Sequence, residues 1–202
     1  MMGLPLKKKE RLPLRKPDGE ILTQIKMALG WDPIKKQIKS SGFFGLFSSV
    51  QEVEQSVDFD ASVIAYSNGR LVDIVYFGKK SGLNNAVRHS GDNLTGGGDG
   101  DDEIIVCDLE SLKSQGITDL FFVINSFSGQ KFSEVENAFC RVVDAATDQE
   151  HSRFDLSHGE PVTAYVMTRV ELKENQWEII GVGAHASART AKELEPFVRS
   201  LI

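Results

Sequence analysis

The sequence predicts an all-β protein, an antiparallel β-sandwich with long loops and a C-terminal helix. Three observations support this fold class. Many short β-rich stretches lie between turn residues, one pair of stretches flanks an Asn-Gly turn, and helical periodicity is clear only at the C-terminal end. We expect a single domain over residues 1–202 that carries a flexible insertion at about residues 34–56.

The chain begins with extended segments. Lysines and arginines crowd this start and suit a solvated strand edge. Between them, leucines of one parity indicate an extended chain with one face inward: Leu4, Leu6, Leu12 and Leu14. A second extended stretch, residues 21–29, ends before Gly30-Trp31-Asp32-Pro33, where the proline stops a regular element.

The insertion follows this proline. It carries Lys35, Lys36 and Lys39, and then apolar residues separated by glycine and serine: Phe43, Phe44, Leu46 and Phe47. Because these residues lack regular periodicity, we predict that they are exposed and contact a partner protein or a membrane surface rather than the core.

The clearest local signal is a β-hairpin over residues 63–77. Two β-rich arms flank Asn68-Gly69, which accepts the positive φ angles of a type I′ turn. A glycine-rich loop follows over about residues 78–102, and loops of this length in compact domains are usually functional or disordered. Further strands are expected at residues 103–109, 120–126, 137–144 and 153–156, with another hairpin over 162–172 and 177–183.

The C-terminal end is expected to be helical, because its apolar residues follow the spacing of one helix face. These residues are Leu194, Phe197, Val198, Leu201 and Ile202. Thr190 and Glu193 have the spacing of a capping box, but Pro196 would then lie inside the helix. A helix that begins at Pro196 therefore stays open as an alternative.

Composition and charge argue against nucleic-acid binding and against a membrane-spanning protein. Net charge is −6, which argues against nucleic acid as the main partner, and no apolar run approaches the roughly 20 residues that cross a bilayer. The start lacks the apolar core of a secretory signal, so we expect a cytoplasmic protein, with peripheral contact at the inner face of the membrane as an option. Cys107 and Cys140 lie in apolar, strand-like runs and are expected to be reduced and buried.

An acidic, glycine-rich run at residues 89–103 carries the main chemical signal. Carboxylates about 4 Å apart repel by roughly 4 kcal/mol at a protein surface, and a cation makes such packing favourable. Glycines allow the backbone to turn its carbonyl groups inward. Calcium accepts six to eight oxygen ligands in flexible geometry, so it fits this run better than magnesium does. A solvated acidic turn is the alternative.

Two known calcium-binding sequence patterns partly match this run. Counted from Asp92, an EF-hand places Leu94 and Gly96 where side-chain oxygens are required, so that pattern fails. Residues 97–105 match the nonapeptide of calcium-binding β-rolls, but that architecture needs stacked copies and the chain has one. Upstream, Asp58 and Asp60 share one side of a strand by two-residue alternation and could complete a site.

At these residues the sequence resembles the TerD family of tellurium-resistance proteins, and most of all its TerZ branch. The resemblance spans nearly the whole chain and rests on these runs: Gly30-Trp31-Asp32-Pro33, Asp58-Phe59-Asp60-Ala61-Ser62, His89-Ser90-Gly91-Asp92-Asn93-Leu94-Thr95-Gly96, Gly98-Asp99-Gly100-Asp101-Asp102-Glu103, Asn125-Ser126-Phe127 and residues 132–141. One departure is Gly97, where members of the family often carry glutamate.

The resemblance implies a calcium-binding β-sandwich with two neighbouring ions, encoded among genes for resistance to tellurite and other stresses. It implies a non-catalytic binding or scaffold module whose partners are calcium and other proteins of the same stress-resistance system. The implied ligands are the side chains of Asp32, Asp58, Asp60, Asp92, Asn93, Asp99, Asp101, Asp102 and Glu103, with backbone carbonyls around Leu94 and Gly96.

Alternatives to this interpretation are an enzyme of unrecognised type, thiol chemistry and a membrane-associated docking module. The chain has no GxSxG, HExxH or P-loop signature, and of its histidines only His89 lies beside the acidic run. We therefore expect no catalytic activity. Thiol chemistry would require Cys107 or Cys140 to be exposed in a positive field. The membrane alternative depends on the lysines and aromatic residues of the insertion.

Overall fold

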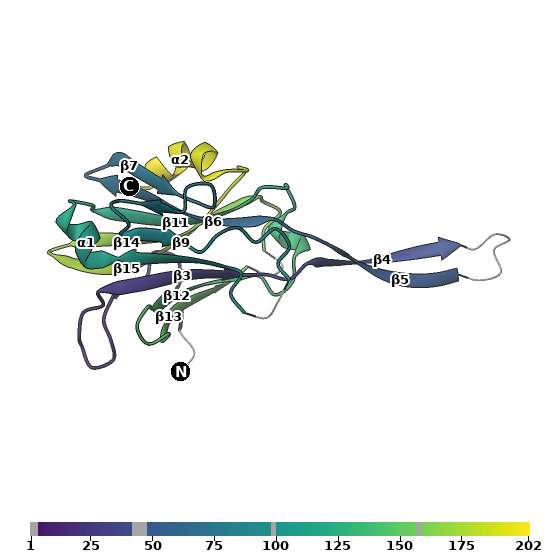
Figure 1. Ribbon diagram of the computed structural model, residues 1–202, viewed down its shortest axis with the longest axis horizontal. Coiled ribbons are helices and arrows are strands. Elements are labelled where there is room, and N and C mark those ends of the chain that lie inside the picture. Colours follow the sequence, from purple (N-terminus) through teal and green to yellow (C-terminus); the bar gives the residue numbers. More distant parts are fainter. Residues whose placement is uncertain (1–3, 42–47, 98–99, 157–158) are drawn as a thin grey trace.

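Two sheets packed face to face form the body of the protein, and a long hairpin projects from one end (Figure 1). This is a computed structural model, which describes residues 4–41, 48–97, 100–156 and 159–202. The strands are mostly antiparallel, and the predicted sandwich with a C-terminal helix is confirmed.

One sheet has seven strands. In spatial order they are β1 (Leu4–Pro5), β13 (Glu150–Asp155), β12 (Phe139–Asp144), β3 (Gln24–Gly30), β10 (Glu103–Asp108), β9 (Val87–His89) and β8 (Ser81–Gly82). The other sheet has six: β2 (Arg11–Pro13), β15 (Gln176–Ala186), β14 (Ala164–Lys173), β11 (Asp119–Ser126), β6 (Phe59–Ser67) and β7 (Arg70–Val75). Strands β4 (Ile34–Ser41) and β5 (Ser48–Gln55) pair with each other in a separate two-stranded sheet. The helical elements are α1 (Leu109–Ser114), η1 (Phe132–Glu134) and α2 (Ala191–Arg199).

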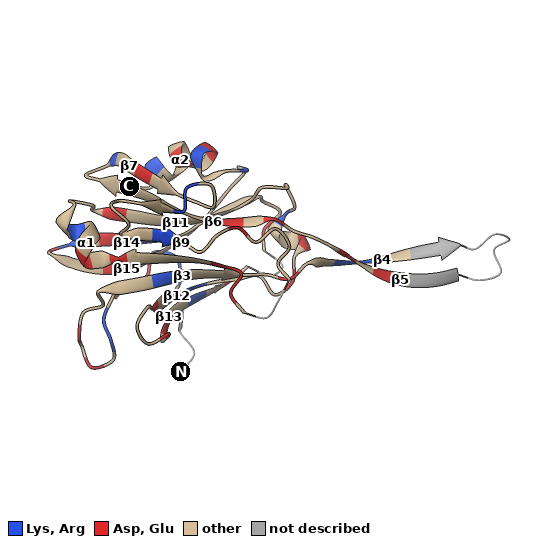
Figure 2. Ribbon diagram, in the orientation of Figure 1, with Lys and Arg blue, Asp and Glu red and all other residues tan. Residues whose placement is uncertain are grey.

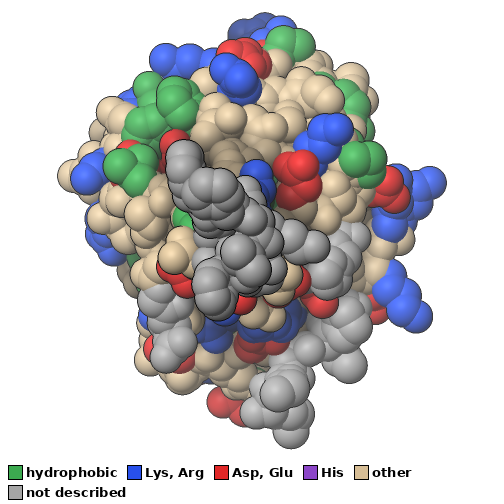
Figure 3. Space-filling view, turned by 90° about the vertical axis from the view of Figure 1, so that its right-hand side faces the viewer, with side chains coloured by type: hydrophobic (Ala, Val, Ile, Leu, Met, Phe, Trp, Pro, Cys, Tyr) green, Lys and Arg blue, Asp and Glu red, His purple; other side chains and the backbone are tan. Residues whose placement is uncertain are grey.

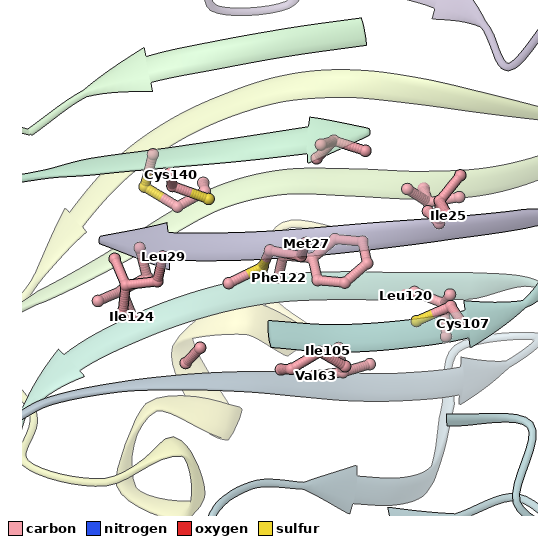
Figure 4. Packing of buried hydrophobic residues seen from close by; sticks show 14 of the residues in the cluster. Ile25, Met27, Leu29, Val63, Ile105, Cys107, Leu120, Phe122, Ile124 and Cys140 are labelled. Carbon is pink, nitrogen blue, oxygen red and sulfur yellow. The ribbon is translucent and has the colours of Figure 1, made fainter. Parts of the chain in front are cut away.

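The main core lies between the two sheets. Figure 4 shows Met27 and Leu29 of β3 facing Phe122 and Ile124 of β11, and all four are fully buried. Both cysteines also lie in this core: Cys107 and Cys140. The predicted burial of both cysteines is confirmed. Burial raises the pKa of the Cys140 thiol to about 12, which disfavours the reactive thiolate.

A second core lies on the outer face of the six-stranded sheet. Helix α2 covers this face, and Leu194 and Val198 pack on Tyr66 and Phe121. Thr190 caps the helix by accepting a hydrogen bond from the Glu193 amide at 3.2 Å. The helix therefore begins at Ala191 with Pro196 inside it, and the alternative start at Pro196 is wrong. The cap and the buried residues of the first turn offset the one hydrogen bond that the proline removes.

The Asn-Gly hairpin is confirmed as β6 and β7, with positive φ at Asn68 and Gly69. The stretch 78–102 was predicted as one loop, but it contains β8 and β9, which extend the seven-stranded sheet beyond β10. Helix α1 was not predicted, because six residues are too few to show a helical period. Asp108 caps it by accepting from the Ser111 amide.

The insertion forms a regular hairpin rather than an irregular segment. Strands β4 and β5 pair over their whole length, with Lys36 opposite Val53. Figure 2 shows basic residues on β4 and acidic residues on β5. The predicted contact residues 43, 44, 46 and 47 lie outside the described residues, so their exposure stays a prediction. Neither α1 nor α2, nor any other helix in the described part, is long and apolar enough to cross a membrane.

Candidate metal site

The acidic residues gather at the end of the sandwich from which the hairpin projects. Strand β3 leads through Trp31 into β4, and β5 leads through Val57 into β6. The acidic loop returns at the same end, because Glu103 at the start of β10 pairs with Leu29 near the end of β3. Figure 3 views the molecule from this end and shows acidic side chains at several places around the hairpin.

Trp31 holds the acidic loop against the body. Its indole is buried and donates from Nε1 to the Val57 carbonyl at 2.8 Å, while its backbone amide donates to Asp102 Oδ2 at 2.9 Å. Gly96 lies against the indole with a φ of +64°, and a side chain there would overlap the ring. Only glycine suits both the backbone conformation and the close approach, which explains its place in the sequence run.

Glu103 links the two sheets at this end. It is fully buried, and its Oε2 accepts from the Ala61 amide at 2.8 Å while its Oε1 accepts from the Asn93 amide at 3.2 Å. His89 lies 3.4 Å from the same Oε2. Its Nδ1 accepts from the Gly91 amide, so the ring hydrogen belongs on Nε2, which points at the Ala61 carbonyl at 3.1 Å.

Three carboxylates converge beside Glu103. Asp58, Asp60 and Asp92 each offer an oxygen within 4.8 Å of the other two. Two-residue alternation places Asp58 and Asp60 on the same side of the chain as it enters β6. Buried oxygens of both, Oδ1 in each case, accept no hydrogen bond from any residue that the structure describes. Asp60 Oδ2 accepts from Asn125 Nδ2 at 2.9 Å.

The electrostatics of this cluster favour a cation. Burial, together with the charges of Glu103 and Asp58, raises the pKa of Asp60 to about 8 against the opposing effect of the Asn125 hydrogen bond. Burial also raises the pKa of Asp58, with contributions from Asp92 and Glu103. Without a cation, the fold therefore opposes full ionisation of the cluster.

A second acidic group lies around Asp102. Asp32 Oδ2 accepts from Asn137 Nδ2 at 2.6 Å, and Asp101 forms a two-point ion pair with Arg141 at 2.9 and 2.6 Å. Asp102 Oδ1 accepts from the Asn93 side chain at 2.6 Å. Burial raises the pKa of Asp102, and the charges of Asp32, Glu103 and Asp101 act in the same direction.

The predicted ligands thus fall into two groups, and within the described ranges only Asp58, Asp60 and Asp92 converge as a set of three. Asn93 Oδ1 accepts from the amides of Thr95 and Gly96, so it shapes the loop. The Leu94 side chain is 59% exposed. Asp99 lies outside the described residues.

Two contributors were missed by sequence reasoning: Arg141, which pairs with Asp101, and Asn137, which binds Asp32. Both approach the loop because β12 lies beside β3 in the sheet. Nothing in the local sequence reports that adjacency.

The fold and the acidic end together define a β-sandwich that gathers carboxylates in loops beside a projecting hairpin. Residues 2–197 match the TerD domain family. The chain is 38% identical to the tellurium resistance protein TerZ of Serratia marcescens, over 92% of each chain. It is 33% identical to the stress response protein SCP2 of Bacillus subtilis (strain 168), over 90% of this chain and 92% of the relative. The chain belongs to the TerD domain family.

Solved structures agree on the fold. A homologue of telluride resistance protein (TerD) from Streptomyces coelicolor A3(2) superposes with a TM-score of 0.67 over 86% of this chain and 95% of that one. The two sequences are 19% identical, so this likeness bears on the fold alone.

Proposed function

We propose that the protein is a calcium-binding, non-catalytic module of a tellurite-resistance and general stress-response system. One observation carries the proposal: Asp58, Asp60 and Asp92 converge within 4.8 Å, and two of their buried oxygens find no donor among the described residues. Buried carboxylate oxygens without donors are costly, and a bound cation removes that cost.

The donor set fits a hard cation. All the converging atoms are carboxylate oxygens, which calcium prefers and which thiol-seeking metals do not. The cluster joins the start of β6 to the loop that carries Asp92, and this loop can adjust to the many oxygens that calcium takes. Magnesium demands a tight octahedron and retains its waters, so it suits such a site less well. Backbone carbonyls of Leu94 and Gly96 would complete the shell, with Asp99 as a further ligand.

A second ion would use the group around Asp102. Asp32 and Asp101 are the other carboxylates there, and Arg141 already supplies a positive charge to Asp101. Calcium at this position therefore competes with the arginine. Glu103 adds negative charge to both groups, while its own oxygens accept backbone hydrogen bonds.

The projecting hairpin is the proposed contact surface for a protein of the same system, with peripheral membrane contact as the alternative. Its register places Ile34, Lys36, Ile38 and Val53 on one face, and Ile38 and Val53 are 51% and 42% exposed. An exposed two-stranded ribbon with apolar side chains in solvent is marginal by itself, which suits a surface that a partner covers. The relatives' names support the assignment to stress resistance, and none of those quoted names a reaction.

Calorimetric titration tests the central claim. Calcium should bind and raise the free energy of unfolding by about 2.7 kcal/mol at a hundredfold excess over the dissociation constant. For a chain of this size that corresponds to roughly 5 to 11 °C in melting temperature. Asp92→Asn should weaken binding, whereas Asp18→Asn, at an exposed turn, serves as the matched control. No binding heat and no shift in the parent protein would leave the acidic loop as a solvated turn.

A further inference from the structure

A cavity of about 370 Å³ lies on the outer face of the six-stranded sheet, beside the first turn of α2. Its floor is formed by Asp60 and Ser62 of β6 and by Asn125 of β11. These residues share the outer face with Ile64 and Tyr66, which pack under α2 further along the strand. The volume is within the range of small-molecule sites.

The floor presents hydrogen-bond acceptors that nothing in the described chain satisfies. Asp60 Oδ1, Ser62 Oγ and Asn125 Oδ1 all lack a partner there, although the three residues are at most 2% exposed. The orientation of the Asn125 amide is fixed, because its Nδ2 donates both to Asp60 Oδ2 at 2.9 Å and to the Arg189 carbonyl at 2.6 Å. Its free oxygen is therefore an acceptor only.

The walls of the cavity are aromatic. Phe77 meets Tyr76 and Phe127 edge-on, with ring centroids 5.5 and 6.1 Å apart. Aromatic faces attract cations through their quadrupole. One ammonium is already present at the mouth, since Lys192 Nζ lies 5.4 Å from the Tyr76 ring centroid.

Acidic groups lie close to the floor. Asp60 belongs both to the cavity and to the carboxylate cluster, so Asp58 and Asp92 are near it. A ligand that enters must supply hydrogen-bond donors to the acceptors of the floor, and a cationic ligand would displace the proton of Asp60 and pair with its carboxylate. A carboxylate or phosphate offers no such donors and would be attracted only by Lys192 and the start of α2.

We propose that this cavity binds a small primary amine. An alkylammonium group carries three N–H donors, which match the three unpartnered acceptors of Asp60, Ser62 and Asn125. Its apolar body packs against the rings of Phe77 and Phe127. The proposal goes beyond calcium binding and shares only Asp60 with it.

Three probes of similar size that share a phenyl ring test the chemical class: 2-phenylethylamine, 2-phenylethanol and phenylacetate. Each is titrated into the full chain in the presence of a calcium chelator, so the result is separate from the fate of the calcium proposal. The amine should bind at least tenfold more tightly than the other two, with NMR shifts at Ser62, Phe77 and Phe127. Equal affinities, or tighter binding of phenylacetate, would overturn the proposal.

Two variants locate the binding. Ser62→Ala should lower the affinity for 2-phenylethylamine several-fold without lowering the melting temperature, because its hydroxyl has no partner to lose. Ser152→Ala is the matched control, since Ser152 is a buried serine of β13 whose Oγ is equally unpartnered among the described residues. If Ser62→Ala and Ser152→Ala lower the affinity for 2-phenylethylamine equally, or if neither lowers it, the placement of the amine in this cavity is wrong.

Lys192→Gln separates an amine site from an anion site. Lys192 is exposed, so the fold should tolerate the change. Removal of a like charge at the mouth should raise the affinity for 2-phenylethylamine. A drop in that affinity, with a drop for phenylacetate, would identify an anion site and overturn the proposal.

Discussion

The metal-free protein should lose stability as the pH rises from 5 to 7, and Asp60 should account for a defined part of the loss. The pKa of Asp60 in the fold is raised to about 8, mainly by burial. In the unfolded chain it is about 3.9. A raised pKa means that the folded state holds a proton that the unfolded state has released. The stabilisation is complete below the unfolded pKa and is lost as the pH rises through the folded pKa.

One extra proton bound in the folded state lowers the free energy of unfolding by about 1.4 kcal/mol for each unit that the pH rises. Between pH 5 and 7 this amounts to about 2.7 kcal/mol, or roughly 5 to 11 °C in melting temperature for a chain of this size. Asp60→Asn removes the titrating group and retains an oxygen that can accept from Asn125. Between pH 5 and 7, the melting temperature of Asp60→Asn should therefore fall by roughly 5 to 11 °C less than that of the parent protein.

Melting curves at several pH values, recorded with a chelator, measure the difference between the two chains. The comparison is needed because other groups titrate in the same range. Burial raises the pKa of Asp58 and Asp102, which adds to the slope, and burial lowers the pKa of His151, which opposes it. Parallel curves for the parent and Asp60→Asn would refute the reasoning. In saturating calcium the contribution of Asp60 should vanish, since the ion requires the ionised carboxylate.

Three further predictions concern the rest of the molecule. Asp101→Asn with Asp102→Asn should reduce the calcium stoichiometry from two to one in a calorimetric titration, and an unchanged stoichiometry would remove both from the ligand set. Deletion of residues 35–49 should leave calcium affinity unchanged and cost little thermal stability, whereas a large fall in melting temperature would show that the hairpin supports the core. Cys107→Ala with Cys140→Ala should leave tellurite resistance unchanged in a growth assay, because both thiols are buried, and lost resistance in a stably folded variant would contradict this.

The sequence correctly predicted those elements that depend on residues close together in the chain. The turn at Asn68-Gly69 requires positive φ at both positions, and it forms as expected. The apolar period of residues 194–202 likewise predicted helix α2. Asp58 and Asp60 were placed on one side by alternation alone, and they do converge with Asp92.

Contacts that depend on the order of strands in a sheet could not be predicted from residues close together in the chain. Arg141 reaches Asp101 only because β12 pairs with β3, which pairs in turn with β10. The same pair affects what Asp101→Asn is expected to do to the stability of the metal-free protein. From charge alone, loss of Asp101 relieves repulsion, but the ion pair with Arg141 means that this carboxylate is already compensated. The cavity was equally hidden, because Ser62 and Asn125 come from strands that are distant in sequence.

The acidic loop and the hairpin are mechanically connected through one side chain. Trp31 packs against Gly96 of the loop, and its indole donates to Val57 at the other side of the hairpin base. Its amide also binds Asp102. Under the proposed calcium binding, a rearrangement of the loop would act on the residue that links β3 to β4, and through Val57 on the segment between β5 and β6. This geometry would give the proposed calcium occupancy a physical route to the hairpin, which a carboxylate cluster elsewhere on the sandwich would lack.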